Sequence, residues 1–311
     1  MHVLVTGGTG HSGSHIIPEL LSAGHDVTAV VRSDEAAAAV TALGATARRG
    51  DLRDLDDLRE AASVADGVIH VAHRQDLLPV GGMDAVARAE IDVMNAYRDA
   101  LAGTGKPLVA AGSIGSPGHL GRPVVETDPA LPADDDHSGT LRMRNTVEST
   151  VIDLAEHGVR SSIVRMANIA HSEVDQHGFL PTLIALARGK GFAGYPGDGS
   201  NRWNAIHIRD VARIYRLALE KGEPGRYWHA VADGEVPLRA LAEAIGERLG
   251  VPAVSIPLDE LMVPGYFGFL SNVVTHSYPA SNLITRRELG WEPLEPGLFD
   301  GLDNGHYFPA R

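Results

Sequence analysis

The strongest constraint on the fold lies in the first thirty-two residues. An apolar run, Val3-Leu4-Val5, leads into a glycine-rich segment from Thr6 to Gly13, and a helical pattern follows. A second apolar run then ends just before Arg32. A strand, a Gly-x-x-Gly-x-x-Gly loop and a helix in this order are typical of a dinucleotide-binding unit.

Each glycine of this loop is expected to have a separate physical task. Gly7 allows a tight turn off the strand, Gly10 lets the backbone approach a pyrophosphate, and Gly13 lets the helix pack closely on the sheet. The pyrophosphate is expected at the helix N-terminus, where unpaired N–H groups and the helix dipole favour anions. The loop residues predicted to bind the cofactor are Thr6, Gly7, Gly8, Thr9, Gly10, His11, Ser12 and Gly13.

Short apolar runs alternate with helical patterns through the first half of the chain. The apolar runs cover residues 2–6, 27–31, 67–72, 107–111 and 160–166. The helical patterns cover residues 12–23, 34–43, 54–63, 84–103 and 140–157. This alternation predicts an α/β fold: a Rossmann-type, doubly wound parallel sheet with helices on both faces.

The second half of the chain is less regular. Residues 227–231 indicate a further strand and residues 238–249 an amphipathic helix, whereas prolines and loops dominate from residue 251 onward. We therefore expect two parts. Residues 1–170 with about 205–232 would form the cofactor-binding domain, and residues 171–204 with 233–311 a smaller, interrupted C-terminal lobe that supplies the substrate pocket.

Composition excludes several classes of function. The net charge of −13 argues against nucleic acid or an anionic membrane as a partner. The absence of cysteine excludes disulfides, thiolate nucleophiles and cysteine-bound zinc. No apolar run reaches the roughly 18 residues that span a bilayer, and a strand starting at residue 2 leaves no room for a signal peptide, so we expect a cytoplasmic protein. His11 and His15 have a helical spacing without an accompanying zinc motif, and no metal is predicted.

Further motifs along nearly the whole chain carry a family resemblance. They are Gly50-Asp51-Leu52, Val68 to His73, Ile163 to Asn168, Ala205 to Ala212 and Leu289-Gly290-Trp291. Together with the glycine loop, they resemble the extended short-chain dehydrogenase/reductase superfamily, of the NAD-dependent epimerase/dehydratase type. The resemblance implies adenine contact by the Asp51 segment, a cofactor-lining end of the fourth strand and a sixth-strand tail at the nicotinamide. The residues so implied are Asp51, Leu52, Val71, Ala72, His73, Met166, Ala167 and Asn168.

The choice of cofactor can be argued from the end of the second strand. Relatives that use NAD place a carboxylate there to bind the ribose hydroxyls. Here Val31 is followed by Arg32 and Ser33. A guanidinium and a hydroxyl suit a 2′-phosphate, so the sequence predicts NADP(H) in preference to NAD(H).

The catalytic pattern of the family is only partly present. Ser113 follows the fifth strand at the expected serine position. The expected tyrosine and lysine are missing, because no Tyr or Lys occurs between Ser113 and Glu148. Alignment on Val147-Glu148 puts Thr140 at the tyrosine position and Arg144 at the lysine position.

The missing pair changes the expected chemistry. A threonine hydroxyl cannot ionise usefully at neutral pH, and Arg144 can hold the ribose but stays protonated. Ser113, beside the cofactor, could polarise the reacting oxygen, together with Thr140 or a water. His137 and His73 are candidate proton donors, since histidine titrates near neutral pH. Tyr195, Trp203 and Asn204, with Ser113, are candidates for the substrate pocket.

Together these features predict an NADP(H)-dependent oxidoreductase acting on a small organic substrate. Two alternatives stay open: an isomerase, dehydratase or cyclase that retains the cofactor, and a non-catalytic cofactor-sensing protein. The helices expected at 84–103 and 140–157 occupy positions that build dimers in many relatives, so either a monomer or a homodimer is compatible with the sequence.

Overall fold

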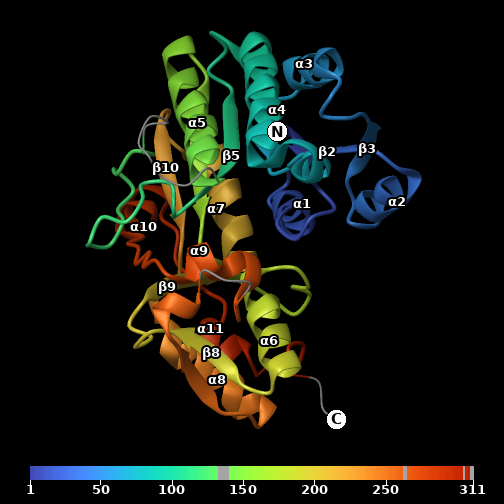
Figure 1. Cartoon of the computed structure of the whole chain (residues 1–311). Helices are drawn as coiled ribbons and strands as arrows, with labels where there is room; N and C mark the ends of the chain where they lie inside the picture. The colour runs from blue at the N-terminus through green and yellow to red at the C-terminus, as the bar shows by residue number, and fades with distance from the viewer. Residues whose placement is uncertain (132–139, 262–264, 304, 309–311) are drawn as a thin grey trace.

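Seven parallel strands form the central sheet of the protein (Figure 1). The computed structural model describes residues 1–131, 140–261, 265–303 and 305–308, without the side chains of 140–144, 269 and 272. In spatial order the strands are β10 (Arg226–Ala230), β6 (Arg160–Met166), β5 (Pro107–Ser113), β4 (Gly67–His70), β1 (His2–Thr6), β2 (Asp26–Val31) and β3 (Thr46–Arg49).

Helices cover both faces of this sheet, because successive side chains of each strand point to opposite faces. Val3 and Val5 of β1 join the apolar core beneath α1 (Gly13–Ser22), α2 (Asp34–Ala42) and α7 (Ile208–Lys221). Leu4 points the other way, into the core beneath α3 (Leu55–Val64), α4 (Leu78–Leu101) and α5 (Thr140–Asp153). The predicted doubly wound fold is confirmed.

The strand order places a crevice at the centre of the sheet. From β1 the chain proceeds outward to β2 and β3, and then returns to β4 on the other side of β1. Thr6 at the end of β1 is paired with both Val30 of β2 and His70 of β4. In doubly wound sheets, ligands bind where the order reverses, outside the carboxyl ends of the strands.

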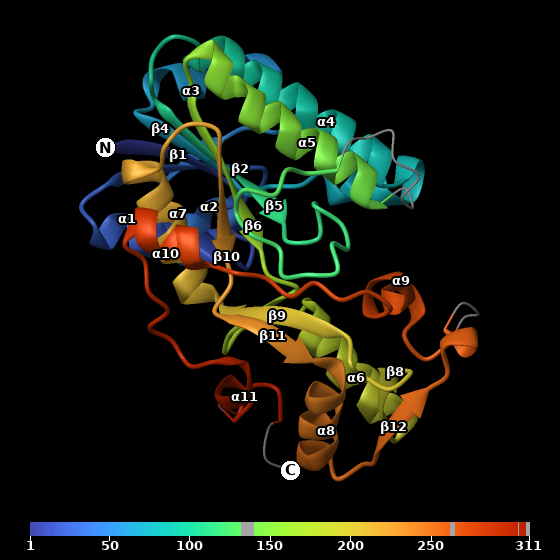
Figure 2. The same ribbon diagram turned by 90° about the vertical axis from the view of Figure 1, so that its left-hand side faces the viewer.

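The remaining strands form two small sheets beside the large one (Figure 2). One contains β11 (Asp233–Pro237), β9 (Arg202–His207) and β7 (Ile169–His171), and the other contains β12 (Ala253–Ile256) and β8 (Ala193–Pro196). The remaining helices are α6 (Phe179–Lys190), α8 (Leu238–Leu249), α9 (Ser271–Val274), α10 (Leu283–Leu289) and α11 (Leu298–Gly301). Of these helices, α10 packs against α7 and against β10 of the seven-stranded sheet.

Two local features depart from the simple sequence pattern. The third strand, β3, is not among the predicted apolar runs, because it is an edge strand whose Arg48 and Arg49 form ion pairs with Asp57 and Asp34. Helix α4 is interrupted at Gly82, whose φ of +61° is outside the helical range.

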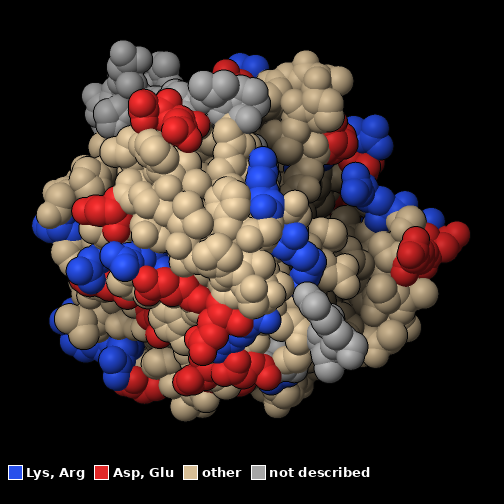
Figure 3. Space-filling view, turned by 60° about the horizontal axis from the view of Figure 1, so that its bottom comes forward, with Lys and Arg blue, Asp and Glu red and all other residues tan. Residues whose placement is uncertain are grey.

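No helix within the described ranges is long and apolar enough to cross a membrane. On the face drawn in Figure 3, acidic side chains lie beside basic ones, without an extended basic patch.

Candidate cofactor and active site

A pocket of about 630 Å³ opens at the carboxyl ends of β1, β2 and β4. Its walls come from the glycine loop, the β2–α2 junction, the segment after β3 and the segment after β4. The lining residues include Thr6, Gly7, Gly8, Thr9, Gly10, Arg32, Ser33, Glu35, Asp51, Leu52, Val71, Ala72, His73 and Arg74. Twelve of the predicted cofactor residues therefore line one pocket, at the reversal point of the strand order.

Glycine is required in the loop for steric reasons. Gly7 has a φ of +78°, and a Cβ there would lie 2.8 Å from the backbone nitrogen of Ala72. A Cβ on Gly13 would lie 2.1 Å from the carbonyl oxygen of Gly7. The Gly10 N–H donates to that same Gly7 oxygen at 3.0 Å, which closes the turn. The result is a bare backbone at the helix N-terminus, a surface that fits the pyrophosphate of a dinucleotide.

The wall contributed by the β2–α2 junction combines a guanidinium with a helix N-terminus. Arg32 is exposed and lines the pocket. The Ser33 hydroxyl accepts a hydrogen bond from Ala36 N–H at 3.1 Å, so Ser33 is the N-cap of α2. That hydroxyl keeps its own proton to donate to an anion.

Asp51, on the facing wall, is held by its neighbour Arg53. The Arg53 guanidinium donates to both carboxylate oxygens, at 2.9 and 3.0 Å, and its backbone N–H donates as well. These hydrogen bonds hold the pKa of Asp51 below its usual value. The carboxylate is therefore an ionised, preformed acceptor at the pocket wall.

His73 lines the same pocket and is paired with a buried carboxylate. Its Nδ1 lies 3.0 Å from Oε2 of Glu90 on α4. The His73 side chain is 25% exposed, whereas that of Glu90 is only 4% exposed. The Glu90 carboxylate therefore fixes the orientation of a histidine that solvent can reach. The sequence interpretation proposed His73 but missed Glu90.

Ser113 ends β5, next to the strand that leads to His73. His70 is paired with Ala110, and Ser113 and His73 each lie three residues farther along. The Ser113 N–H donates to Oε1 of Glu148 at 2.8 Å, and its Oγ accepts from the Gly115 N–H at 3.1 Å. The serine is half-buried and rigidly placed.

A buried ion pair supports the loop after Ser113. Glu148 accepts a hydrogen bond from Nε of Arg165 at 3.0 Å, and both side chains are almost completely buried. Glu148 also accepts from the hydroxyl of Ser116. Arg165 in turn donates to the Asp128 carbonyl at 2.7 Å and stacks on the Tyr227 ring. Glu148 thus links α5 and β6 to the serine loop.

Three of the proposed catalytic residues lie where the structure describes no side chain. His137 lies outside the described residues. Thr140 and Arg144 lie in the first turns of α5, but nothing is described of their side chains. Their proposed roles stay predictions.

The predicted nicotinamide and substrate residues are not among those that line the described pocket. Met166 ends β6, and the following residues are Ala167 and Asn168. Asn204 is fully buried, accepts from the Asn168 N–H at 2.8 Å and donates to the Tyr278 carbonyl.

The two aromatic candidates are also outside this pocket. Trp203 is fully buried against Phe179, and Tyr195 lies on β8 of the two-stranded sheet near Arg239. The structure does not bring Tyr195, Trp203 and Asn204 to the pocket that His73 lines.

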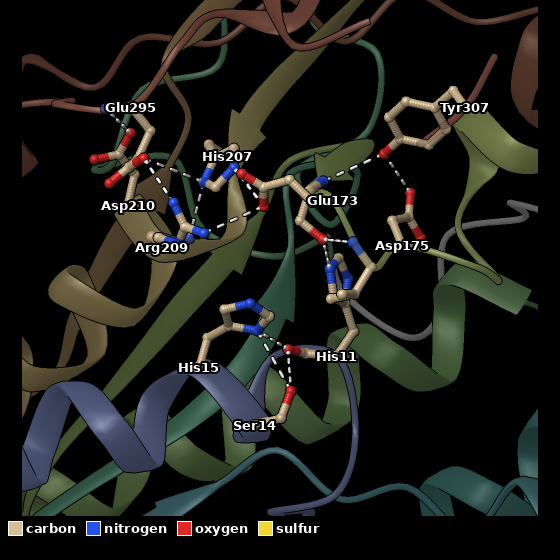
Figure 4. Close-up of polar contacts among 12 residues, drawn as sticks. His11, Ser14, His15, Glu173, Asp175, His207, Arg209, Asp210, Glu295 and Tyr307 are labelled. Atoms are coloured by element: carbon tan, nitrogen blue, oxygen red, sulfur yellow. Dashed lines mark hydrogen bonds and ion pairs between the residues drawn. The ribbon is translucent and has the colours of Figure 1, made fainter. Parts of the chain in front are cut away.

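His11 connects the glycine loop to the C-terminal part of the chain (Figure 4). Its Nε2 lies 2.8 Å from the Ser172 hydroxyl. The Tyr307 hydroxyl accepts from Ser172 N–H at 3.2 Å and donates to Asp175 at 3.1 Å. His15 reaches back to the His11 carbonyl at 2.9 Å. Of the loop residues, His11 therefore has a supporting role in this structure.

A group of histidines surrounds this connection. The rings of His171 and His207 meet edge to face at 5.3 Å. Burial lowers the pKa of His171 to about 4, and burial also lowers the pKa of His207 and of His11. Near neutral pH these rings are therefore uncharged.

Comparison with known proteins identifies the family. Residues 3–230 match the model of the NAD dependent epimerase/dehydratase family. The chain belongs to this family. The resemblance drawn from the glycine loop and the later motifs is confirmed, and with it the nicotinamide-dinucleotide cofactor class.

Relatives of this family member differ in their chemistry. A protein of Schizosaccharomyces pombe described as uncharacterised is 36% identical over 99% of this chain and 100% of its own length. A 4-hydroxy-2-methyl-3-oxo-4-farnesyl-3,4-dihydroquinoline-1-oxide ketoreductase of Stigmatella aurantiaca is 28% identical over 86% of this chain and 80% of its own length. A dTDP-glucose 4,6-dehydratase of Streptomyces venezuelae, solved with NAD bound, has a TM-score of 0.76 at 20% identity, over 99% of this chain and 96% of that chain.

Proposed function

We propose that this family member is an oxidoreductase that prefers NADP(H) and acts on a small organic substrate. The observation that carries the proposal is Arg32, which lines the pocket where β2 ends. A guanidinium at this place favours a 2′-phosphate and is a poor partner for two ribose hydroxyls. The ketoreductase among the relatives is consistent with a reductase.

Several residues would divide the binding of the cofactor among them. The loop backbone from Gly7 to Gly10 would hold the pyrophosphate, and Arg32 with the N-terminus of α2 the 2′-phosphate. Leu52 and Asp51 would border the adenine, and Arg144 the ribose. The nicotinamide, when bound, supplies the electron pair for reduction of the substrate.

The proton is proposed to come from His73. Its ring is reachable from the pocket, and Glu90 fixes its orientation. Ser113 would hydrogen-bond to the reacting oxygen from the neighbouring strand end. In this role His73 would replace the missing tyrosine as the proton donor.

The two-part division is part of the proposal. Residues 1–170 with about 205–232 would bind the cofactor, and residues 171–204 with 233–311 would bind the substrate. Its support is that β8, β11 and β12 belong to the small sheets, whereas β10 belongs to the large one.

Turnover tests the proposal directly. The purified chain is incubated with NADPH and a panel of carbonyl, imine and activated-alkene substrates. Oxidation of one NADPH for each substrate reduced supports an oxidoreductase. Turnover of a substrate with the cofactor retained unchanged would instead indicate an isomerase or dehydratase, and no turnover despite tight binding would indicate a cofactor sensor.

A further inference from the structure

The pocket that Arg32 lines has a second guanidinium in its wall. Arg74 lies four residues after the end of β4 and belongs to the pocket wall. Its side chain is only 12% exposed. Its Nε donates to the two carboxylate oxygens of Asp76 at 2.9 and 3.2 Å, and its Nη2 donates to Oδ2 at 2.8 Å.

Asp76 is the more exposed partner of this pair. Its side chain is 49% exposed, four times as much as that of Arg74. The pKa of Asp76 is lowered to about 2, mainly by the hydrogen bonds from Arg74, and the charge of Arg32 is a smaller contribution in the same direction. Asp76 is thus an ionised group that interacts with cations from both sides of the pocket, Arg32 after β2 and Arg74 after β4.

We infer that Arg74 and Arg32 together form the binding site for the 2′-phosphate, and that Asp76 neutralises Arg74 until the phosphate replaces it. The inference rests on the proposed preference for NADP(H). In this arrangement Arg74 helps to determine cofactor specificity. It follows β4, whereas the sequence argument for NADP(H) considered only the residues that follow β2.

The charges around the pocket explain why one guanidinium is insufficient. Glu35 lines the same wall as Arg32, and Asp76 lies nearby. Glu35 offsets the single charge of Arg32, whereas Asp76 and Asp51 are each bound through both oxygens by an arginine, Arg74 and Arg53 respectively. Once Asp76 turns away, Arg74 supplies the second positive charge for a phosphate dianion.

Replacement of Asp76 by a phosphate is chemically reasonable. A guanidinium binds phosphate oxygens through paired hydrogen bonds, as it does a carboxylate, and phosphate carries more charge. A half-exposed carboxylate loses little when it turns to water, because exposed ion pairs contribute little free energy. Arg74 itself stays in the pocket wall.

The test uses two nucleotides that differ only in the phosphate. Affinities for 2′,5′-ADP and 5′-AMP are measured by calorimetry at fixed ionic strength for the wild type and Arg74→Gln. We expect about a tenfold or greater loss for 2′,5′-ADP, as for a lost charge-assisted hydrogen-bonded pair, and less than a twofold change for 5′-AMP. Equal losses for both nucleotides would assign Arg74 to the adenine or ribose instead and overturn the inference.

Arg59→Gln is the matched control. Arg59 also pairs with an aspartate close in sequence, Asp56, but it lies on α3 and does not line this pocket. The Arg59→Gln variant should bind 2′,5′-ADP and 5′-AMP with the affinities of the wild type. Asp76→Asn tests the second half of the inference: removal of the competing carboxylate should tighten 2′,5′-ADP binding severalfold, and weaker binding would contradict the exchange.

Failure of the inference is distinguishable from failure of the proposed function. If the wild type binds 2′,5′-ADP no better than 5′-AMP, the preference for NADP(H) itself is wrong. If the wild type prefers 2′,5′-ADP and Arg32→Ala removes that preference but Arg74→Gln does not, only the role of Arg74 is wrong. Circular dichroism of each variant verifies that it is folded.

Discussion

Glu148 accepts a hydrogen bond from the Ser113 N–H at 2.8 Å, and the same carboxylate is ion-paired with the buried Arg165. The serine loop is therefore positioned by a charge pair that water does not reach. Removal of one partner leaves the other charged and buried, which is far more costly than the pair itself.

Glu148→Ala should lower the free energy of unfolding by about 3 to 5 kcal/mol, because Arg165 loses its counter-charge. Chemical denaturation measures the loss. Adding Arg165→Met in the same chain should recover part of it, since a flexible apolar side chain replaces the unpaired charge. A loss below about 1 kcal/mol for Glu148→Ala would mean that the pair carries little of the loop's stability.

Gly13→Ala should abolish dinucleotide binding and destabilise the protein, because the added Cβ would lie 2.1 Å from the Gly7 oxygen. Thermal unfolding and nucleotide titration detect both effects. Gly189→Ala in α6 is the control, since a Cβ there meets no atom within 4 Å. That helical site should gain up to about 1 kcal/mol. Unimpaired binding by Gly13→Ala would contradict the loop geometry.

The protein should lose stability as the pH falls from about 6.5 towards 4. Burial lowers the folded-state pKa of His171 to about 4, so the unfolded chain binds its proton first. By pH 5 this histidine alone should cost about 2 kcal/mol. Urea denaturation at pH 7 and pH 5 measures the difference, which His171→Leu should reduce by that amount. An unchanged difference in the variant would show that His171 does not titrate as described.

His73→Asn should lower kcat by about a hundredfold or more while NADPH binding changes little, because the proton donor is lost. An NADPH titration of the variant separates loss of the proton donor from loss of cofactor binding. His25→Asn is the control: His25 pairs with Glu220 at 2.9 Å but does not line the pocket. An unaltered kcat in His73→Asn would exclude the proposed role.

The fold was predictable from the sequence wherever pattern and burial agree. Strand β1 is buried on both faces and reads as a continuous apolar run, and the loop after it carries glycine at residues 7 and 13, where a Cβ would clash with the backbone. Strand β3 lacks that signal, because its half-exposed side chains at the sheet edge are ion-paired rather than packed.

The candidate site was predictable only where it follows a strand end. Arg32 and His73 could be located by counting from β2 and β4. The partner of Glu90 could not be predicted, since only the fold brings α4 to His73. The sequence did carry a signal that Glu90 is buried, because it lies between the apolar residues Val86 and Val93 on one helix. The two backbone hydrogen bonds of Asn204 could not be predicted, because they depend on the strand pairing of the small sheet.

The most direct test of the account is titration of ligand-free protein with NADPH and NADH, for the wild type and for Arg32→Ala. The account predicts tighter binding of NADPH by the wild type and a loss of roughly tenfold or more in Arg32→Ala, with NADH affinity nearly unchanged. Equal affinity of the wild type for both nucleotides, or no binding of either, would contradict it.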